Sequence, residues 1–227
     1  MMGLVYSTTT ALMKGALRFF GDWHVEGKEH VPLTGPLLVV ANHQSNIDPP
    51  LLAASLPRRA YFMAKRGLFH DPVLAYLLKS YGVFPLNRDG GDLAAIRWAL
   101  GRLQRNAAVA LFPEGTRSPG AMRKALPGIS MFALRSGAPI LPVGITGSEH
   151  IRPLWRVTMP TGKFRVKIGH PFSLPPVEGK ISRERMESAT TMVMERVAAL
   201  LPESYRGVYA IDGKTSLGVG SGEGKGN

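Results

Sequence analysis

The sequence predicts an α/β domain in which helices cover both faces of a mixed, largely parallel sheet, preceded by an N-terminal amphipathic helix. Short β-rich runs alternate with helical patterns along the middle of the chain, which is typical of this class. Two of these runs, residues 37–40 and 107–112, are apolar without alternation, as expected for strands covered on both faces. With 227 residues, of which 44% are hydrophobic, the chain can bury a core around such a sheet.

The elements expected within this domain follow one another along the chain. Strands are predicted at residues 37–40, 83–86, 109–112, 140–145 and 164–168, and helices at residues 50–56, 72–80, 92–105, 128–136 and 182–201. The helix at 92–105 has Asp92 as its N-cap and an apolar stripe along one face. Pro202 closes the last helix, because proline cannot continue it.

The first twenty residues form a separate feature. The stretch from Leu4 to Phe20 is apolar and aromatic, but its charges, Lys14 and Arg18, come late, which is the reverse of a secretory signal. No run of about 18 apolar residues occurs, so a membrane-spanning helix is not expected. If the segment is helical, one set of side chains gathers on the face opposite the two charges: Thr9, Met13, Ala16, Leu17 and Phe20.

Two interpretations of this helix fit its spacing. The helix can lie in a bilayer interface with its basic residues toward lipid phosphates, or it can pack on the core as an ordinary surface helix. We divide the chain into residues 1–24, an amphipathic membrane-interface helix, residues 25–205, the α/β domain, and residues 206–227, a flexible tail. The tail prediction depends on six glycines among residues 213–227.

Composition narrows the classes of ligand. The chain has 28 Lys and Arg against 16 Asp and Glu, a net charge of +12, which attracts nucleic acids, phosphorylated metabolites and acidic lipid head groups. The absence of cysteine excludes disulfides, thiolate catalysis and thiolate metal sites. An acid-free basic stretch at residues 150–170 favours a nucleic-acid-binding protein as the alternative class. Aromatic residues are only 8% of the chain, however, and sit mostly in apolar runs, so we expect no nucleic acid partner.

Polar residues follow the first predicted strand, where α/β sheets usually place their ligands. His43 and Asp48 are five residues apart, and a loop that enters a helix can bring the carboxylate to one ring nitrogen. The carboxylate would fix the tautomer of the imidazole, and the other nitrogen could then take a proton from a hydroxyl, which contributes roughly 10²–10⁴-fold in rate. A histidine that merely packs in a turn beside Asp48 is the alternative.

A second polar segment, residues 111–118, also follows an apolar strand. Arg117 can fork onto phosphate oxygens, Gly115 lets the backbone approach a ligand, and Thr116 supplies a hydroxyl donor. Glu114 can orient Arg117 or accept from a substrate hydroxyl. An exposed turn with an incidental ion pair is the alternative.

Basic residues lie between these two segments. Residues 58–66 hold four positive charges and no acid: Arg58, Arg59, Lys65 and Arg66. Another predicted strand, residues 83–86, is followed by Arg88. Such a run is commonly a solvated face, but three strand ends with reactive or basic side chains favour one shared cleft.

These segments resemble the motifs of the glycerophospholipid acyltransferases. Asn42-His43 through Asp48 is similar to their histidine–four–aspartate motif, and residues 112–118 to their Phe-Pro-Glu-Gly-Thr-Arg-Ser motif. Residues 82–84 with Arg88 resemble the intervening motif, and residues 138–143 the fourth. The resemblance covers about residues 25–172 and is greatest to the lysophosphatidate (1-acylglycerol-3-phosphate) acyltransferases.

The resemblance implies a glycerol-3-phosphate-acyltransferase-like fold and an acyl transfer from acyl-CoA or acyl-carrier protein to the sn-2 hydroxyl of 1-acylglycerol 3-phosphate, which gives phosphatidate. It makes His43 the general base and Asp48 its partner. It assigns substrate binding to Lys65, Arg88, Glu114, Gly115, Thr116 and Arg117. Glycerol 3-phosphate or an amino-acid lyso-lipid is the alternative acceptor, and hydrolysis the alternative reaction. Both substrates are anionic amphiphiles, so we expect a monotopic or peripheral protein on an anionic membrane surface, at its cytoplasmic face.

The residues themselves favour direct attack by a substrate hydroxyl. A thiol acyl-enzyme is impossible without cysteine, and no Gly-x-Ser-x-Gly sequence occurs to present a serine nucleophile. Ser45 lies close to His43 in the sequence and is the remaining rival nucleophile. No cluster of metal ligands is evident, so we expect neither a metal nor a resident cofactor.

Overall fold

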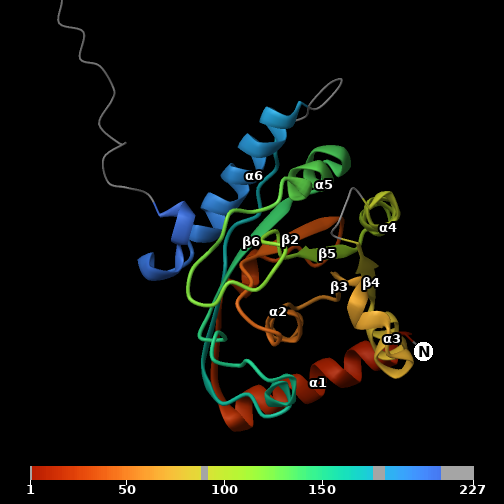
Figure 1. The fold of residues 1–227 in the computed structure, drawn as a ribbon, viewed down its shortest axis with the longest axis vertical. Coiled ribbons are helices and arrows are strands. Elements are labelled where there is room, and N and C mark those ends of the chain that lie inside the picture. Colours follow the sequence, from red (N-terminus) through yellow and green to blue (C-terminus); the bar gives the residue numbers. More distant parts are fainter. Residues whose placement is uncertain (1, 88–91, 176–181, 211–227) are drawn as a thin grey trace, which may run out of the picture.

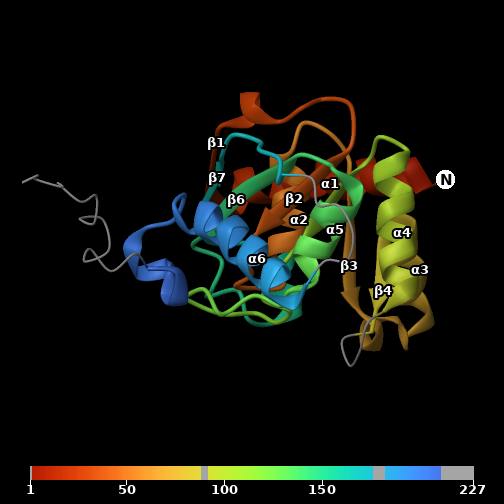
Figure 2. The same ribbon diagram turned by 90° about the horizontal axis from the view of Figure 1, so that it is seen from above.

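A computed structural model describes residues 2–87, 92–175 and 182–210. Seven strands form one sheet, in the spatial order β1-β7-β6-β2-β5-β3-β4. Figure 2 shows this order from β1 and β7 at one side of the molecule to β4 at the other. The strands are β1 (Gly21–Glu26), β2 (Leu37–Ala41), β3 (Ala60–Lys65), β4 (Val83–Leu86), β5 (Ala108–Leu111), β6 (Ile140–Thr146) and β7 (Gly162–Ile168).

The helices are α1 (Met2–Phe20), α2 (Asp48–Ser55), α3 (Pro72–Tyr81), α4 (Leu93–Gln104), α5 (Gly128–Ser136) and α6 (Arg183–Ala198). Short 3₁₀ turns lie between these helices and after α6: η1 (Lys28–His30), η2 (Arg66–Phe69), η3 (Leu154–Val157), η4 (Glu203–Tyr205) and η5 (Gly207–Tyr209). The predicted N-cap of α4 is confirmed, because the Asp92 carboxylate accepts from the backbone N–H groups of Ala94 and Ala95.

The sheet is mixed and largely parallel, as predicted. Strands β6, β2, β5, β3 and β4 all run in the same direction, whereas β7 is antiparallel to β6 and β1 is parallel to β7. The carboxyl ends of those five strands therefore share one edge of the sheet. The segments that the sequence singled out after β2, β4 and β5 begin at this edge, which we call the carboxyl edge.

Helices cover both faces of the sheet, which is also confirmed. Strand β2 is wholly buried and its side chains alternate between two cores. Leu37, Val39 and Ala41 join the core beneath α1, α2 and α3, and Leu38 and Val40 join the core beneath α4, α5 and α6. Figure 1 shows these two layers, with α1 and α2 on one side of the sheet and α5 and α6 on the other. This two-sided burial is the reason for the unbroken apolar runs.

Two strands were not predicted. Strand β1 lies at the edge of the sheet, and only its alternate residues are partly buried, so it carries polar residues such as Asp22 and His24. Strand β3 lies within the run of residues 58–66 that we interpreted as a basic cluster. The strand separates Arg58 and Arg59 from Lys65 and Arg66 by roughly 20 Å, at about 3.3 Å per residue. The cluster is therefore two pairs at opposite edges of the sheet.

Helix α1 packs on the domain with part of the stripe that we predicted. Leu17 is buried together with Tyr6 and Thr10, which the prediction did not include, whereas Thr9 is exposed. The opposite side of the helix leaves three large apolar side chains in solvent: Leu4, Leu12 and Phe19. Among the described helices none is long and apolar enough to cross a membrane.

The predicted division of the chain differs from the described structure at two places. The boundary at residues 24 and 25 falls inside β1, which is part of the sheet. After residue 205 the chain stays attached to the domain as far as Ala210, since the Val208 N–H donates to the Met122 carbonyl and the Tyr209 hydroxyl accepts from the Ala125 N–H. The rest of the expected tail, residues 211–227, lies outside the described residues.

Candidate active site

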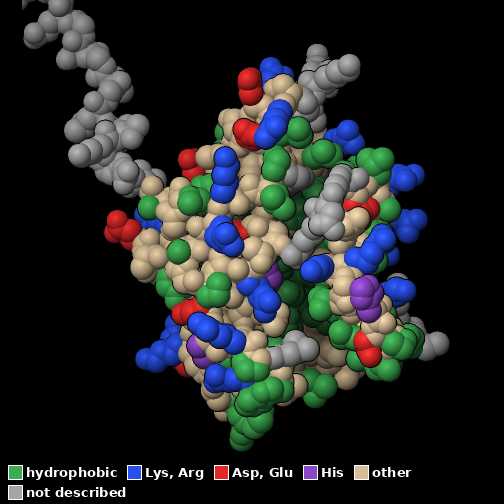
Figure 3. All heavy atoms as spheres, in the orientation of Figure 1, with side chains coloured by type: hydrophobic (Ala, Val, Ile, Leu, Met, Phe, Trp, Pro, Cys, Tyr) green, Lys and Arg blue, Asp and Glu red, His purple; other side chains and the backbone are tan. Residues whose placement is uncertain are grey.

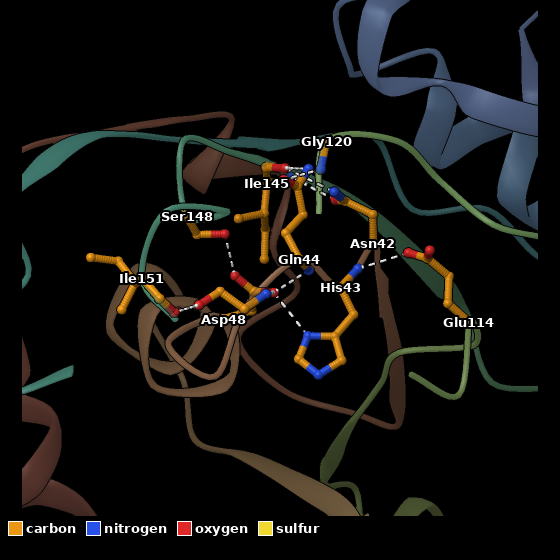
Figure 4. Close-up of polar contacts among 10 residues, drawn as sticks. Asn42, His43, Gln44, Asp48, Glu114, Gly120, Ile145, Ser148 and Ile151 are labelled. Carbon is orange, nitrogen blue, oxygen red and sulfur yellow. Dashed lines mark hydrogen bonds and ion pairs between the residues drawn. The ribbon is translucent and has the colours of Figure 1, made fainter. Parts of the chain in front are cut away.

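His43 and Asp48 meet at the carboxyl edge. His43 follows β2 after one residue, and the chain then turns, with the Asp48 N–H donating to the Ser45 carbonyl, before α2 begins at Asp48. Pro49 and Pro50 suit this start, because the first turn of a helix needs no backbone N–H donors. The turn brings His43 Nδ1 to 2.8 Å from Asp48 Oδ2, as Figure 4 shows. The predicted contact between the two side chains is therefore present.

The Asp48 carboxylate is held by four hydrogen bonds and is completely buried. Oδ2 accepts from His43 Nδ1 and from the backbone N–H groups of Gln44 and Ser45, at 2.5 and 2.7 Å. Oδ1 accepts from the Ser148 hydroxyl at 2.5 Å. Buried polar groups are normally hydrogen-bonded in this way, and here the bonds also fix the direction in which the carboxylate faces.

The imidazole of His43 presents its second nitrogen away from Asp48. Because a carboxylate only accepts, we assign the Nδ1 proton to the hydrogen bond with Asp48, which leaves Nε2 as an acceptor. In Figure 4 this nitrogen lies on the side of the ring remote from Asp48. The ring packs against Phe112, with 4.5 Å between the centroids, and 15% of the side chain is exposed. Nε2 is therefore placed to receive a proton from a bound hydroxyl.

The second motif is fastened directly to the first. The Glu114 carboxylate accepts from the backbone N–H of His43 at 2.8 Å and from that of Arg123 at 2.9 Å. The Ser118 N–H donates to the His43 carbonyl at 2.7 Å. Both backbone groups of His43 are thus bonded to the segment that follows β5, and the two motifs form one site.

Glu114 occupies a position that differs from the substrate contact or Arg117 partner expected from the sequence. The residue is 5% exposed, and its two carboxylate oxygens are bonded to backbone groups. Burial raises the pKa of the Glu114 carboxyl, and the backbone hydrogen bonds counteract part of this rise. Glu114 therefore shapes the site by holding two loops together.

Gly115 is required by the turn in which it lies. Its φ of +68° is in the left-handed region, and a Cβ would stand 2.6 Å from Cδ1 of Leu126. This turn directs Thr116 and Arg117 outward, where both are exposed. The Gly115 N–H is bonded to the Phe112 carbonyl, so the turn itself is closed.

Thr116 and Arg117 line a cavity of about 380 Å³, which His43 itself does not line. Gln44 and Ser45, which follow His43, form another wall, and the loop after β6 supplies Arg152. The complete lining is Gln44, Ser45, Thr116, Arg117, Pro119, Glu149, Ile151 and Arg152. Within the described part of the chain, no carboxylate lies within ion-pair distance of Arg117 or Arg152. Two guanidinium groups are therefore available to an anion in this cavity.

The remaining predicted bases are divided between the two edges of the sheet. Lys65 ends β3 at the carboxyl edge, where it is exposed, two strands and roughly 10 Å from β2. Arg88 lies outside the described residues. Arg58 and Arg59 are at the other edge and outside the site, so the four bases of residues 58–66 do not form one cluster. Arg58 donates to the carbonyls of Pro32, Gly35 and Asn106, and the Arg59 guanidinium lies over the rings of Tyr6 and Tyr61.

Some residues of the site had no predicted role there, among them Asn42, Ser148 and Arg152. Asn42 is buried and pairs through its amide with both backbone groups of Ile145, at 2.8 Å each. Ser148 and Arg152 come from the loop after β6, and Arg152 was noticed only as part of a basic stretch. The available signal was that this loop, too, follows the carboxyl end of an apolar strand.

Ser45, the rival nucleophile, is turned toward another partner. Its hydroxyl donates to the Ile151 carbonyl, and its side chain is buried. The hydroxyl proton is therefore not directed at His43, which is the base that a serine nucleophile would need. Over the described ranges of the chain, no group of three or more His, Asp or Glu side chains is arranged to hold a metal ion.

Known proteins resemble this chain over much of its length. The model of the Acyltransferase family matches residues 22–146. The 1-acyl-sn-glycerol-3-phosphate acyltransferase of Bacillus subtilis is 24% identical over 86% of this chain and 96% of its own length. The chloroplastic LPAT1 of Arabidopsis thaliana, of the same name, is 31% identical over 57% of this chain, but only 37% of its own length is covered.

A solved structure has the same fold. The 1-acyl-sn-glycerophosphate acyltransferase PlsC from Thermotoga maritima superimposes with a TM-score of 0.68 at 31% identity, over 88% of this chain and 80% of that one. The family model covers more than half of the chain, and this neighbour shares both fold and sequence over most of its length. With a paired histidine and aspartate at the carboxyl edge and the Glu-Gly-Thr-Arg turn bonded to the backbone of that histidine, this chain belongs to the acyltransferase family.

Proposed function

We propose that this protein transfers a fatty acyl group from acyl-CoA or acyl-carrier protein to the sn-2 hydroxyl of 1-acylglycerol 3-phosphate, which gives phosphatidate. The observation that carries the proposal is the His43–Asp48 pair, 2.8 Å apart, followed directly by two residues, Gln44 and Ser45, that line the same cavity as Arg117. The names of the relatives in Bacillus subtilis and Thermotoga maritima support the choice of acceptor. No resident cofactor takes part, because the acyl donor is a substrate.

The chemistry needs one base and one carboxylate. His43 Nε2 takes the proton of the acceptor hydroxyl while the hydroxyl oxygen attacks the carbonyl carbon of the thioester. Asp48 stabilises the imidazolium that forms. When the tetrahedral intermediate collapses, the carbon–sulfur bond breaks and the thiolate leaves with the proton held by the imidazolium. An ester has formed, a thioester has been cleaved, and His43 is neutral again.

The cavity beside His43 suits the phosphate end of the acceptor. Arg117 can bind phosphate oxygens with two parallel N–H groups, and the Thr116 hydroxyl can donate to a third oxygen. Arg152 lines the same cavity and adds a second positive charge for a phosphate dianion. We include Lys65 and Arg88 as further phosphate contacts, as the family motifs imply. A phosphate held here fixes the position of the hydroxyl next to His43, which lowers the entropic barrier to attack.

The apolar side of α1 suits a membrane surface. Leu4, Leu12 and Phe19 project from α1, and the adjacent α3 exposes Val73, Tyr76 and Leu77. In Figure 3 hydrophobic side chains gather at the lower end of the molecule over α1 and at the lower right over α3. Exposed apolar patches of this kind mark interaction sites, and both substrates are amphiphiles. We propose that this side rests on an anionic membrane from the cytoplasm, where the net charge of +12 also favours binding.

The test is mass spectrometry of the products after the purified protein is incubated with mixed lyso-lipids, glycerol 3-phosphate and both acyl donors. Phosphatidate formed by the natural protein and not by His43→Ala is the expected result. If glycerol 3-phosphate or a lyso-ornithine lipid is acylated instead, that compound is the acceptor and 1-acylglycerol 3-phosphate is not. The latter is a specific alternative, because the lyso-ornithine lipid O-acyltransferase of Pseudomonas aeruginosa is 34% identical over 49% of this chain. Release of free fatty acid alone, or tight oligonucleotide binding without transfer, would overturn the proposal.

A further inference from the structure

Ser148 is joined to the catalytic pair across a hundred residues of sequence. It lies two residues beyond the end of β6, and its hydroxyl donates to Asp48 Oδ1 at 2.5 Å. Both side chains are completely excluded from solvent. No motif of the sequence singles out this serine, and its hydroxyl is bonded to Asp48 and not to the imidazole.

The loop that carries Ser148 is fixed in place. Gly147 has a φ of +83°, and a Cβ on it would overlap the Lys163 carbonyl of β7, so only glycine fits. After Ser148, the Ile151 N–H donates to the Ser148 carbonyl, and the Ile151 carbonyl accepts from the Ser45 hydroxyl. The loop is therefore attached to the His43 segment at two points, Ser148 with Asp48 and Ile151 with Ser45.

The two oxygens of Asp48 are used differently. Oδ2 serves His43 and two backbone N–H groups, whereas Ser148 is the one donor to Oδ1 among the described residues. Without that donor, a buried carboxylate oxygen would lack a partner. The carboxylate could then rotate to share its remaining donors between both oxygens, and Oδ2 would leave its place opposite Nδ1.

We propose that Ser148 is a positioning residue, which holds the Asp48 carboxylate in the orientation that directs His43, and which acts only through Asp48. This inference rests on the proposed roles of His43 and Asp48. A double-mutant cycle separates it from a structural role, because a residue that acts only through Asp48 has nothing to contribute once Asp48 is neutralised.

The experiment compares Ser148→Ala, Asp48→Asn and the double variant, in the full chain, for transfer to lysophosphatidate on vesicles. Ser148→Cys is included because its thiol nearly fills the same volume but donates only weakly. Ser130→Ala is the matched control, since Ser130 is also fully buried and its hydroxyl donates to a carbonyl, that of Pro127, within α5 and its approach. Thermal unfolding of every variant is measured alongside kcat and both KM values.

We expect Ser148→Ala and Ser148→Cys to lower kcat by about tenfold or more, the usual effect of losing a hydrogen bond to a charged group, with both KM values nearly unchanged. In the Asp48→Asn background, Ser148→Ala is expected to cause less than a twofold further loss. Ser130→Ala is expected to lower Tm about as much as Ser148→Ala does, but to leave kcat unchanged.

Two results would overturn the inference: unchanged kcat in both Ser148 variants, or an equal fractional loss from Ser148→Ala with and without Asp48. The second indicates a structural role only. If Ser148→Ala does not fold, the nearly isosteric Ser148→Cys decides by the same kcat criterion. Failure of the proposed function is seen separately, since the natural protein would then make no phosphatidate.

Discussion

The backbone N–H of His43 donates to the carboxylate of Glu114, 71 residues further along the chain, at 2.8 Å. The other Glu114 oxygen accepts from the Arg123 N–H, so this buried side chain joins the base to the loop that supplies Arg117. A glutamate that would be interpreted from sequence as a substrate ligand thus determines where His43 stands relative to the loop that carries Arg117.

Replacing Glu114 by glutamine is expected to weaken both the fold and the site. The amide has one acceptor oxygen, so its NH₂ group would face one of the two backbone N–H donors, leaving that donor unpaired. We expect Glu114→Gln to lower the free energy of unfolding by about 1–3 kcal/mol and to lower kcat. Urea unfolding and steady-state kinetics measure the two effects. A folded variant with normal stability and a raised acceptor KM alone would indicate direct substrate contact instead.

The same residue gives a pH dependence whose sign follows from its burial. Burial raises the pKa of Glu114 in the folded protein above its ordinary value of 4.5, so the folded state binds this proton more tightly than the unfolded state. Stability from this group is complete below the unfolded pKa and is lost as pH rises to the folded pKa. As pH rises just above 4.5, the free energy of unfolding of the natural protein is therefore expected to fall relative to that of Glu114→Gln. At higher pH the difference between the two proteins is expected to stay constant. Urea unfolding of both proteins from about pH 4 to pH 8 checks this. A constant difference would contradict it.

His43→Ala is expected to abolish acyl transfer and leave the fold intact. The general base supplies roughly 10²–10⁴-fold in rate, and its side chain packs at the rim of the structure with 15% exposed, so little core is lost. A second histidine–aspartate pair provides the matched control. His24 Nδ1 lies 3.0 Å from Asp22 on β1, in solvent and three strands away from β2, the strand that His43 follows. His24→Ala is expected to keep full kcat. Comparable activity in the two variants would remove His43 from the mechanism.

The sequence predicted those strands, and the site residues after them, whose apolar pattern matches their burial in the fold. Strand β2 and strand β5 are apolar on both faces because both faces are buried, and the residues of the candidate site follow them. Strand β1 could not be recognised in the same way. It lies at the edge of the sheet. Only every second residue along it faces the core, so the residues between them can be polar.

Other features depended on contacts that sequence spacing does not contain. Arg58 and Arg59 were grouped with Lys65 by proximity in the chain, but β3 carries the two ends of the group to opposite edges. The role of Ser148 depends on the pairing of β6 beside β2, which places the loop after residue 146 against Asp48. The face of α1 that packs inward was also misjudged in part, because Tyr6 and Thr10 turn toward the domain despite their polar groups.

Arg117→Gln is expected to raise the KM for lysophosphatidate by about tenfold, with a much smaller effect on the KM for the acyl donor. The reason is the loss of a charge-assisted pair of hydrogen bonds to phosphate. Arg152→Gln, across the same cavity, is expected to act in the same direction. Arg135→Gln on α5 is the control, since that side chain is exposed and outside the cavity. An equal rise in the KM values for lysophosphatidate and for the acyl donor would show that Arg117 does not bind the acceptor phosphate specifically.

Substitutions on the outer side of α1 test the membrane-binding surface without removing the helix. Deleting α1 would take Tyr6 and Leu17 out of the core, so lost binding could not be separated from lost folding. The double variant Leu12→Asp and Phe19→Asp changes only side chains that are 69% and 83% exposed. It is expected to weaken sedimentation with phosphatidylglycerol vesicles at least tenfold, because apolar area no longer enters the interface and two negative charges now face an anionic surface. Met192→Asp is the control, since Met192 is also exposed but lies on α6, across the molecule from α1 in Figure 1. Vesicle binding that is equal in the natural protein and the double variant, with the same Tm, would show that the exposed side of α1 does not contact the membrane.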